Sequence, residues 1–180
     1  TDDSGNSSSC SFDVTVVDTT VPTLTCPPAL LPVEATSSAG AAVIYNAAVA
    51  TDIGDDDVAI TYSAASASTF AIGTTTVTAT ATDDSGNTDT CTFDVVVADT
   101  TSATITCSEN VSAEATSSSG AAVSYNAATA TDLGDDAVAI TYSAASDSTF
   151  AIGTTTVTAT ATDDSGNVST CTFDVTVVDT

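Results

Sequence analysis

The chain has 180 residues, including 24 Asp or Glu and no Lys, Arg or His, so its formal net charge is −24. This charge excludes nucleic acid and anionic membrane surfaces as partners, because both are bound through cationic side chains. Catalysis is strongly constrained, since no His or Lys can activate a Ser or Cys and no Arg or Lys can hold an oxyanion. Paired carboxylates could serve a glycosidase-like mechanism, but the acids here lie in turns, so we expect no enzyme.

An internal repeat organises the chain. Residues 31–100 match residues 111–180 at 57 of 70 positions, a period of 80, and the segment TDDSGN occurs at residues 1–6, 82–87 and 162–167. Such a period is typical of a tandem array. We therefore predict complete modules over residues 19–99 and 100–180. Residues 1–18 are predicted to be the C-terminal strand hairpin of a truncated preceding module.

Within each repeat, the sequence pattern predicts β-strands and no helices. The first strand contains the segment LTC at residues 24–26, SSAG at 37–40 is a turn, and AAVIYN at 41–46 is the returning strand. TTTVTATATDD at 74–84 alternates Val or Ala with Thr, and CTFDVVVAD at 91–99 directs Cys91, Phe93, Val95 and Val97 inward. Alternation with a period of two, bounded by Gly, Ser and Asp, indicates about seven short strands in a β-sandwich.

The cysteines follow the same repeat. A small core that is rich in Ala needs additional stabilisation, and we predict disulfides Cys26–Cys91 and Cys107–Cys171 between the first and last strands of each module. Free buried cysteines are the alternative. The repeat places the partner of Cys10 in the preceding module, upstream of Thr1, so we expect Cys10 to be unpaired in the chain or bonded to a neighbouring copy. Disulfides indicate an extracellular or cell-surface setting.

Several motifs resemble the hyalin-repeat (HYR) module. These are DTTVPTLTCP, VEATSSAGAAVIY, STFAIGTTTVTATATDDSGN and CTFDVTVVDT, and together they span nearly the whole chain. The resemblance implies tandem immunoglobulin-like β-sandwiches that serve adhesion and extracellular structure without catalysis. Modules of this family often carry a second cysteine pair, and the corresponding segments here are the acidic TDIGDDDVAITY and TDLGDDAVAITY.

Acidic residues are expected to converge at one pole of each module. The strand directions bring the TDDSGN turn and the TDIGDDD loop to the pole at which the preceding module ends, and Glu34 and Glu114 are expected on the surface away from it. Calcium binds carboxylate and carbonyl oxygens, so it could neutralise these acids; turn formation and a solvated surface are the alternative. The predicted ligands are Asp18, Asp52, Asp55, Asp56, Asp57, Asp83 and Asp84 at one junction, and Asp99, Asp132, Asp135, Asp136, Asp163 and Asp164 at the next.

The predicted function is that of a structural repeat unit in an extracellular filament or long cell-surface stalk, whose partners are copies of itself. The alternative is an adhesin module that binds carbohydrate or protein through its loops. Glycosylation is predicted at the N-x-S sequons of Asn6, Asn110 and Asn167, conditional on the organism.

Overall fold

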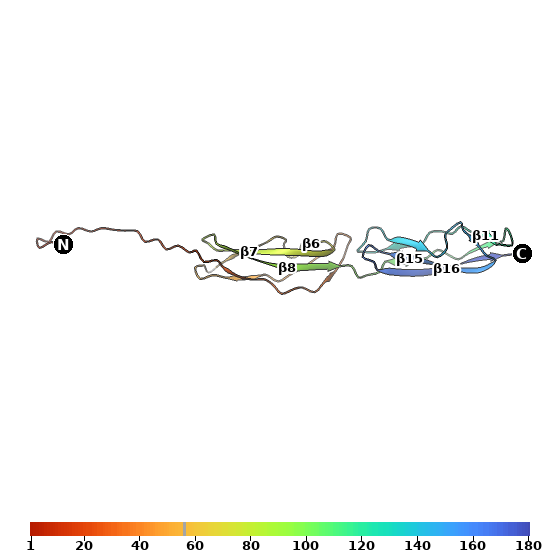
Figure 1. The fold of residues 1–180 in the computed structure, drawn as a ribbon, viewed down its shortest axis with the longest axis horizontal. Coiled ribbons are helices and arrows are strands. Elements are labelled where there is room, and N and C mark those ends of the chain that lie inside the picture. Colours follow the sequence, from red (N-terminus) through yellow and green to blue (C-terminus); the bar gives the residue numbers. More distant parts are fainter. Residues whose placement is uncertain (56) are drawn as a thin grey trace. The chain divides into compact units, whose positions relative to one another are not determined.

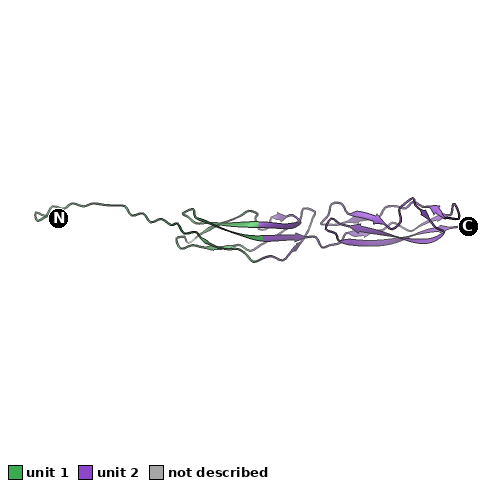
Figure 2. Ribbon diagram, viewed as in Figure 1, with its two compact units in different colours: residues 1–28, 46–64, 77–93 green, residues 29–45, 65–76, 94–180 purple. Residues whose placement is uncertain are grey.

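The computed structural model describes residues 1–55 and 57–180, and within these residues it is built from β-strands and turns (Figure 1). No helix that could cross a membrane is found in this part of the chain. The chain divides into two compact units, which Figure 2 shows in different colours. The first comprises residues 1–28, 46–64 and 77–93, and the second comprises residues 29–45, 65–76 and 94–180.

Each repeat contains eight described strands, one more than the approximate number expected. The first repeat has β1 (Thr23–Thr25), β2 (Val33–Glu34), β3 (Ala41–Ala42), β4 (Val49–Thr51), β5 (Ala59–Tyr62), β6 (Thr69–Phe70), β7 (Gly73–Thr82) and β8 (Thr88–Ala98). The second has β9 (Thr104–Thr106), β10 (Val111–Glu114), β11 (Ala121–Ala122), β12 (Thr129–Thr131), β13 (Ala139–Tyr142), β14 (Thr149–Phe150), β15 (Gly153–Thr162) and β16 (Val168–Val178).

The two repeats have the same sheet topology. In the second repeat, one sheet has the order β10-β16-β15-β13, and the pairs β9–β12 and β11–β14 supply the remaining strands. Strand β10 runs parallel to β16, whereas β13, β15 and β16 pair antiparallel. The first repeat has the equivalent sheet β2-β8-β7-β5 and the pairs β1–β4 and β3–β6. The all-β sandwich predicted from the alternating sequence is confirmed.

The core uses one face of the long strands. Val157, Ala159 and Ala161 on β15 are fully buried, while the intervening threonines are partly or fully exposed. Val157, together with Phe173 and Phe150, belongs to a cluster that packs between the sheets. Small side chains at the centre of the sheet make this core thin, so little apolar area stabilises each module.

The two predicted disulfides are present. Cys26 bonds Cys91 and Cys107 bonds Cys171, with Cα–Cα distances of 5.9 and 5.7 Å. Each bond ties residues at or beside the first strand to the last long strand of the same repeat. Cys10 is exposed and free in this chain.

Residues 1–22 contain no strand, although the TDDSGN turn at their start is formed. The side chains of Phe12, Val14 and Val16 are 83%, 77% and 92% exposed. The matching Phe173, Val175 and Val177 are buried because β10 and β15 flank β16 and a second layer covers it. No described strand pairs with residues 10–18, so of the hairpin predicted over residues 1–18 only the turn forms here.

We expect the double variant Cys107→Ser/Cys171→Ser to lower the free energy of unfolding of the second repeat by about 3–5 kcal/mol. The reason is that the bond closes a loop of 64 residues in the unfolded chain. Urea unfolding followed by circular dichroism measures the change. Cys10→Ser is the matched control and should leave the unfolding midpoint unchanged, because Cys10 is exposed and unbonded. An unaltered midpoint in the double variant would contradict the prediction.

Candidate metal centre at the module junction

The TDDSGN segment forms the tight turn between the two longest strands of each repeat. In the second repeat, Asp163 Oδ1 accepts a hydrogen bond from the Asn167 amide at 2.7 Å, and Asp163 Oδ2 accepts one from Asn167 Nδ2 at 3.0 Å. Gly166 lies between them with φ of 88°, a conformation that favours glycine. The Asp–Asn pair at the ends of the turn therefore closes it.

The same asparagine also binds the start of the linker. Asn167 Nδ2 donates a second hydrogen bond, of 3.2 Å, to the backbone oxygen of Asp99. In the other unit, Asn87 Nδ2 donates to the backbone oxygen of Asp18 at 3.4 Å. The turn thus fixes the backbone of the residue that precedes each repeat, in addition to reversing the chain.

Three aspartates converge beside each of these turns. The sets are Asp18, Asp52 and Asp83 in one unit, and Asp99, Asp132 and Asp163 in the other; within each set, one carboxylate oxygen per residue lies within 4.8 Å of the others. Two like charges at this distance repel by about 3–4 kcal/mol at an effective dielectric constant of about 20. The chain has no cationic side chain to offset this repulsion.

Asp99 is the member of its set that has a buried oxygen without a hydrogen-bond partner among the described residues. Its side chain is 8% exposed, and its Oδ2 atom is buried without a hydrogen-bond donor among the described residues. The Asp99 Oδ1 atom accepts the Thr101 amide at 3.2 Å. Gly134 packs directly against this carboxylate, since a Cβ atom there would lie 2.5 Å from Asp99 Cγ. The loop therefore reserves space for the carboxylate but supplies no donor to its second oxygen.

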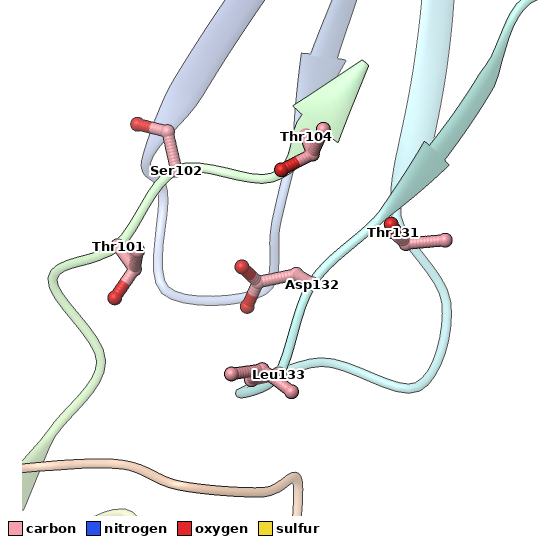
Figure 3. A pocket seen from close by; sticks show the side chains of 6 residues that line it. All are labelled: Thr101, Ser102, Thr104, Thr131, Asp132 and Leu133. Atoms are coloured by element: carbon pink, nitrogen blue, oxygen red, sulfur yellow. The ribbon is translucent and has the colours of Figure 1, made fainter. Parts of the chain in front are cut away.

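Asp132 lines a shallow depression of about 220 Å³. Figure 3 shows its carboxylate in the middle of the lining residues, facing the segment that carries Thr101 and Ser102. Leu133 lines the same depression and is 76% exposed. Small solutes and ions can therefore reach the edge of the acidic set.

The other predicted ligands have different partners. Asp135 accepts the amide of Asp164 at 3.2 Å and that of Ala137 at 2.9 Å, so it links the two acidic loops through backbone donors. Asp136 accepts the Ser38 hydroxyl at 2.6 Å.

The first repeat has the same pattern of backbone donors. There, Asp55 accepts the amides of Asp84 and Asp57, at 3.0 and 2.9 Å. Asp56 lies outside the described residues. In each predicted set, three carboxylates therefore converge around one point, whereas Asp55 and Asp135 accept backbone amides of the loops.

Glu34 has a role that its position in the sequence did not predict. Its carboxylate accepts the Thr100 amide at 2.8 Å, the Thr100 hydroxyl at 2.7 Å and the Thr101 hydroxyl at 2.7 Å. The Thr100 amide is the largest cause, followed by the two hydroxyls, of a Glu34 pKa that is lowered to about 2. Glu114 holds Thr180 in the same way, at 2.8 and 3.0 Å. The contact joins residues 66 positions apart. The one signal for it in the sequence is that a Glu recurs before the SS-x-G turn in both repeats.

The three sequons differ in their surroundings. Asn6 and Asn110 are exposed, whereas Asn167 is half-buried and its Nδ2 atom donates to two acceptors. A glycan on that nitrogen replaces one of its two hydrogens, so at least one of these hydrogen bonds would be lost. Glycosylation therefore remains a prediction for Asn6 and Asn110, and the folded turn disfavours it at Asn167.

We expect Glu34→Gln to loosen the linker at neutral pH, because Gln is uncharged and replaces one of the two acceptor oxygens by an NH2 group that cannot accept from these donors. The contribution of Glu34 to stability is present above its ordinary pKa of 4.5 and is lost as the pH falls through about 2. The difference in unfolding free energy between wild type and variant should therefore vanish across that window. Unfolding measured at several pH values tests this, with the exposed Glu109→Gln as control. A difference that persists at pH 2 would contradict it.

We expect Asn167→Asp to destabilise the second repeat by about 1–3 kcal/mol, because a carboxylate would replace the donor to Asp163 and to the Asp99 carbonyl. Asn110→Asp is the matched control. Asn110 uses its Oδ1 atom as an acceptor for the Asp174 amide, which a carboxylate retains, so its effect should stay within about 0.5 kcal/mol. Thermal unfolding compares the two variants, and equal effects would refute the assigned role of Asn167.

Comparison with known proteins identifies the family of this chain. The family model described as the HYR domain matches residues 17–97 and 98–177. Hyalin from Strongylocentrotus purpuratus is 36% identical over 184 residues, which cover 98% of this chain and 15% of hyalin. Among solved structures, Drosophila N-cadherin EC1-4 covers 88% of this chain and 50% of its own at 13% identity, with a TM-score of 0.42. Protocadherin gammaB7 EC3-6 covers 88% and 51% at 15% identity, with a TM-score of 0.40. The chain belongs to the HYR domain family, with two copies of the domain in tandem.

Proposed function

We propose that the chain is a structural repeat unit of an extracellular filament or long cell-surface stalk, built from tandem HYR modules and acting without catalysis. The observation that carries this proposal is the linker, which is held by side chains of both repeats that it joins. Glu34 holds Thr100 and Thr101, and Asn167 holds the backbone of Asp99. A linker that served only as a flexible tether would need none of these contacts.

The repetition of these contacts supports an array. Asn87 binds the Asp18 backbone as Asn167 binds that of Asp99, and Glu114 binds Thr180 as Glu34 binds Thr100. Each repeat therefore carries both halves of the same joint. Copies of this unit are the expected partners, and calcium at the junctions would add to their rigidity.

Family membership and two disulfides identify the chain as an extracellular repeat unit. The composition supports a structural role, since there is no Lys, Arg or His for acid–base chemistry or oxyanion binding. The chain spans 15% of the length of hyalin, so its place in a whole protein is part of the proposal.

A second candidate is an adhesin module that binds carbohydrate or protein through its loops. The observation in its favour is the apolar residue at the same position of each acidic loop, since Ile53 is 95% exposed and Leu133 is 76% exposed. Leu133 also lines a depression. Binding to a glycan array that is lost in Leu133→Ser would favour this candidate.

We expect the native protein to form filaments or stalks along which this repeat recurs. Electron microscopy of the native material, labelled with an antibody against the 180-residue chain, should show label spaced along extended structures. Pre-immune serum provides the control. Label confined to isolated globular particles would overturn the structural proposal.

A further inference from the structure

We propose that the carboxylates of Asp99, Asp132 and Asp163 form a calcium site that ties the linker to two loops of the second repeat. The proposal deepens the structural role proposed above, on which its consequence for an array rests. Ion binding itself can be measured on the 180-residue chain, whether or not the chain assembles. The two claims can therefore fail separately.

The buried Asp99 Oδ2 atom favours a bound cation. It accepts no hydrogen bond from the described residues, although the Asp99 side chain is more than nine-tenths buried. A buried carboxylate oxygen without a partner is costly, and such oxygens are normally paired with a donor or a cation. The Asp99 carboxylate belongs to a set of three carboxylates, and the chain has no basic residue. A cation supplies the absent partner and the absent charge together.

The spacing of the three carboxylate oxygens fits a calcium ion. For three oxygens no more than 4.8 Å apart, there is a point no more than about 2.8 Å from each of them. Calcium–oxygen distances are about 2.3–2.6 Å, so a small inward movement of the carboxylates would satisfy the ion. Magnesium requires about 2.0–2.1 Å and near-ideal octahedral geometry, which demands a larger contraction. The spacing therefore favours calcium.

Hydrogen bonds outside the site orient all three carboxylates. Asp163 is held by Asn167, Asp132 Oδ2 accepts the Gly134 amide at 2.8 Å, and Asp99 Oδ1 accepts the Thr101 amide. Each group keeps lone pairs for a metal. Gly134 contributes doubly, since its missing Cβ makes room for the Asp99 carboxylate. Contacts that hold ligands in place typically raise metal affinity.

The test is calorimetric titration of the chelator-treated chain with calcium chloride, together with thermal unfolding in calcium and in EDTA. We expect binding at up to about 1 mM calcium, in the range of extracellular sites, and a melting temperature that rises with calcium. Asp99→Asn should bind one ion fewer than wild type. In EDTA the same variant should be at least as stable as wild type, because one of three repelling charges is gone. The effect of Asp99→Asn on stability should therefore be unfavourable in calcium and neutral or favourable in EDTA. An ordinary structural carboxylate would not show this dependence on the ion.

Gly134→Ala provides a test that keeps the charge constant. Its Cβ would push the Asp99 carboxylate out of the set, so we expect the affinity at this site to fall by about tenfold or more. The controls Asp136→Asn and Asp174→Asn each remove one charge outside the set, at groups bonded to Ser38 and Thr156 hydroxyls, and should bind as many ions as wild type.

Three results would overturn the proposal. The first is an Asp99→Asn variant that binds the same number of calcium ions as wild type. The second is a wild-type chain without calcium binding at millimolar concentration. The third is magnesium binding with equal affinity. The equivalent set of Asp18, Asp52 and Asp83 is unchanged in Asp99→Asn, so the effect of this variant is read as the difference in bound ions from wild type.

Discussion

The constraint on which this structure depends is that every carboxylate must be satisfied without a cationic side chain. Most acids meet it with backbone amides and hydroxyls. Glu34 takes three such donors, Asp163 takes the amide and side chain of one asparagine, and Asp135 takes two loop amides. Hydrogen bonds to an ionised acceptor are stronger than those between neutral groups, so they shape the loops effectively. Asp99 Oδ2 is the buried side-chain oxygen for which the described residues offer nothing.

This constraint explains why the acids gather where the modules join. A thin core of Val and Ala leaves each repeat little apolar area with which to position a neighbour. Instead, the linker is held by polar contacts from both sides, with Glu34 on one side and Asn167 on the other. Polar contacts of this kind are directional, and they recur in each repeat because the repeats are nearly identical in sequence. The joint is therefore encoded once and used at each boundary.

The TDDSGN segment illustrates how one short motif performs two tasks. Its Asp and Asn close the turn, and the second hydrogen of the same Asn amide group holds the preceding linker. A segment that only reversed the chain could vary more freely at the Asn position. The copy at residues 2–6 has the same internal hydrogen bonds between Asp2 and Asn6, and there is no linker beside it in the described chain. The turn is therefore a local structure, and its second contact is a tertiary one.

The sequence by itself determined the elements that depend on local pattern and repetition. Alternation of Val or Ala with Thr predicted the buried face of β7 and β15, because successive side chains of a strand point to opposite faces of the sheet. The equivalent positions of the cysteines in the two repeats predicted both disulfides. The choice of three carboxylates from each predicted set was decided only by the tertiary structure. Neighbours in one loop, such as Asp132 and Asp135, point to different partners because loop amides rotate each side chain separately. The contact of Glu34 with Thr100 was likewise decided by folding, because β2 reaches the end of β8 only when the sheet forms.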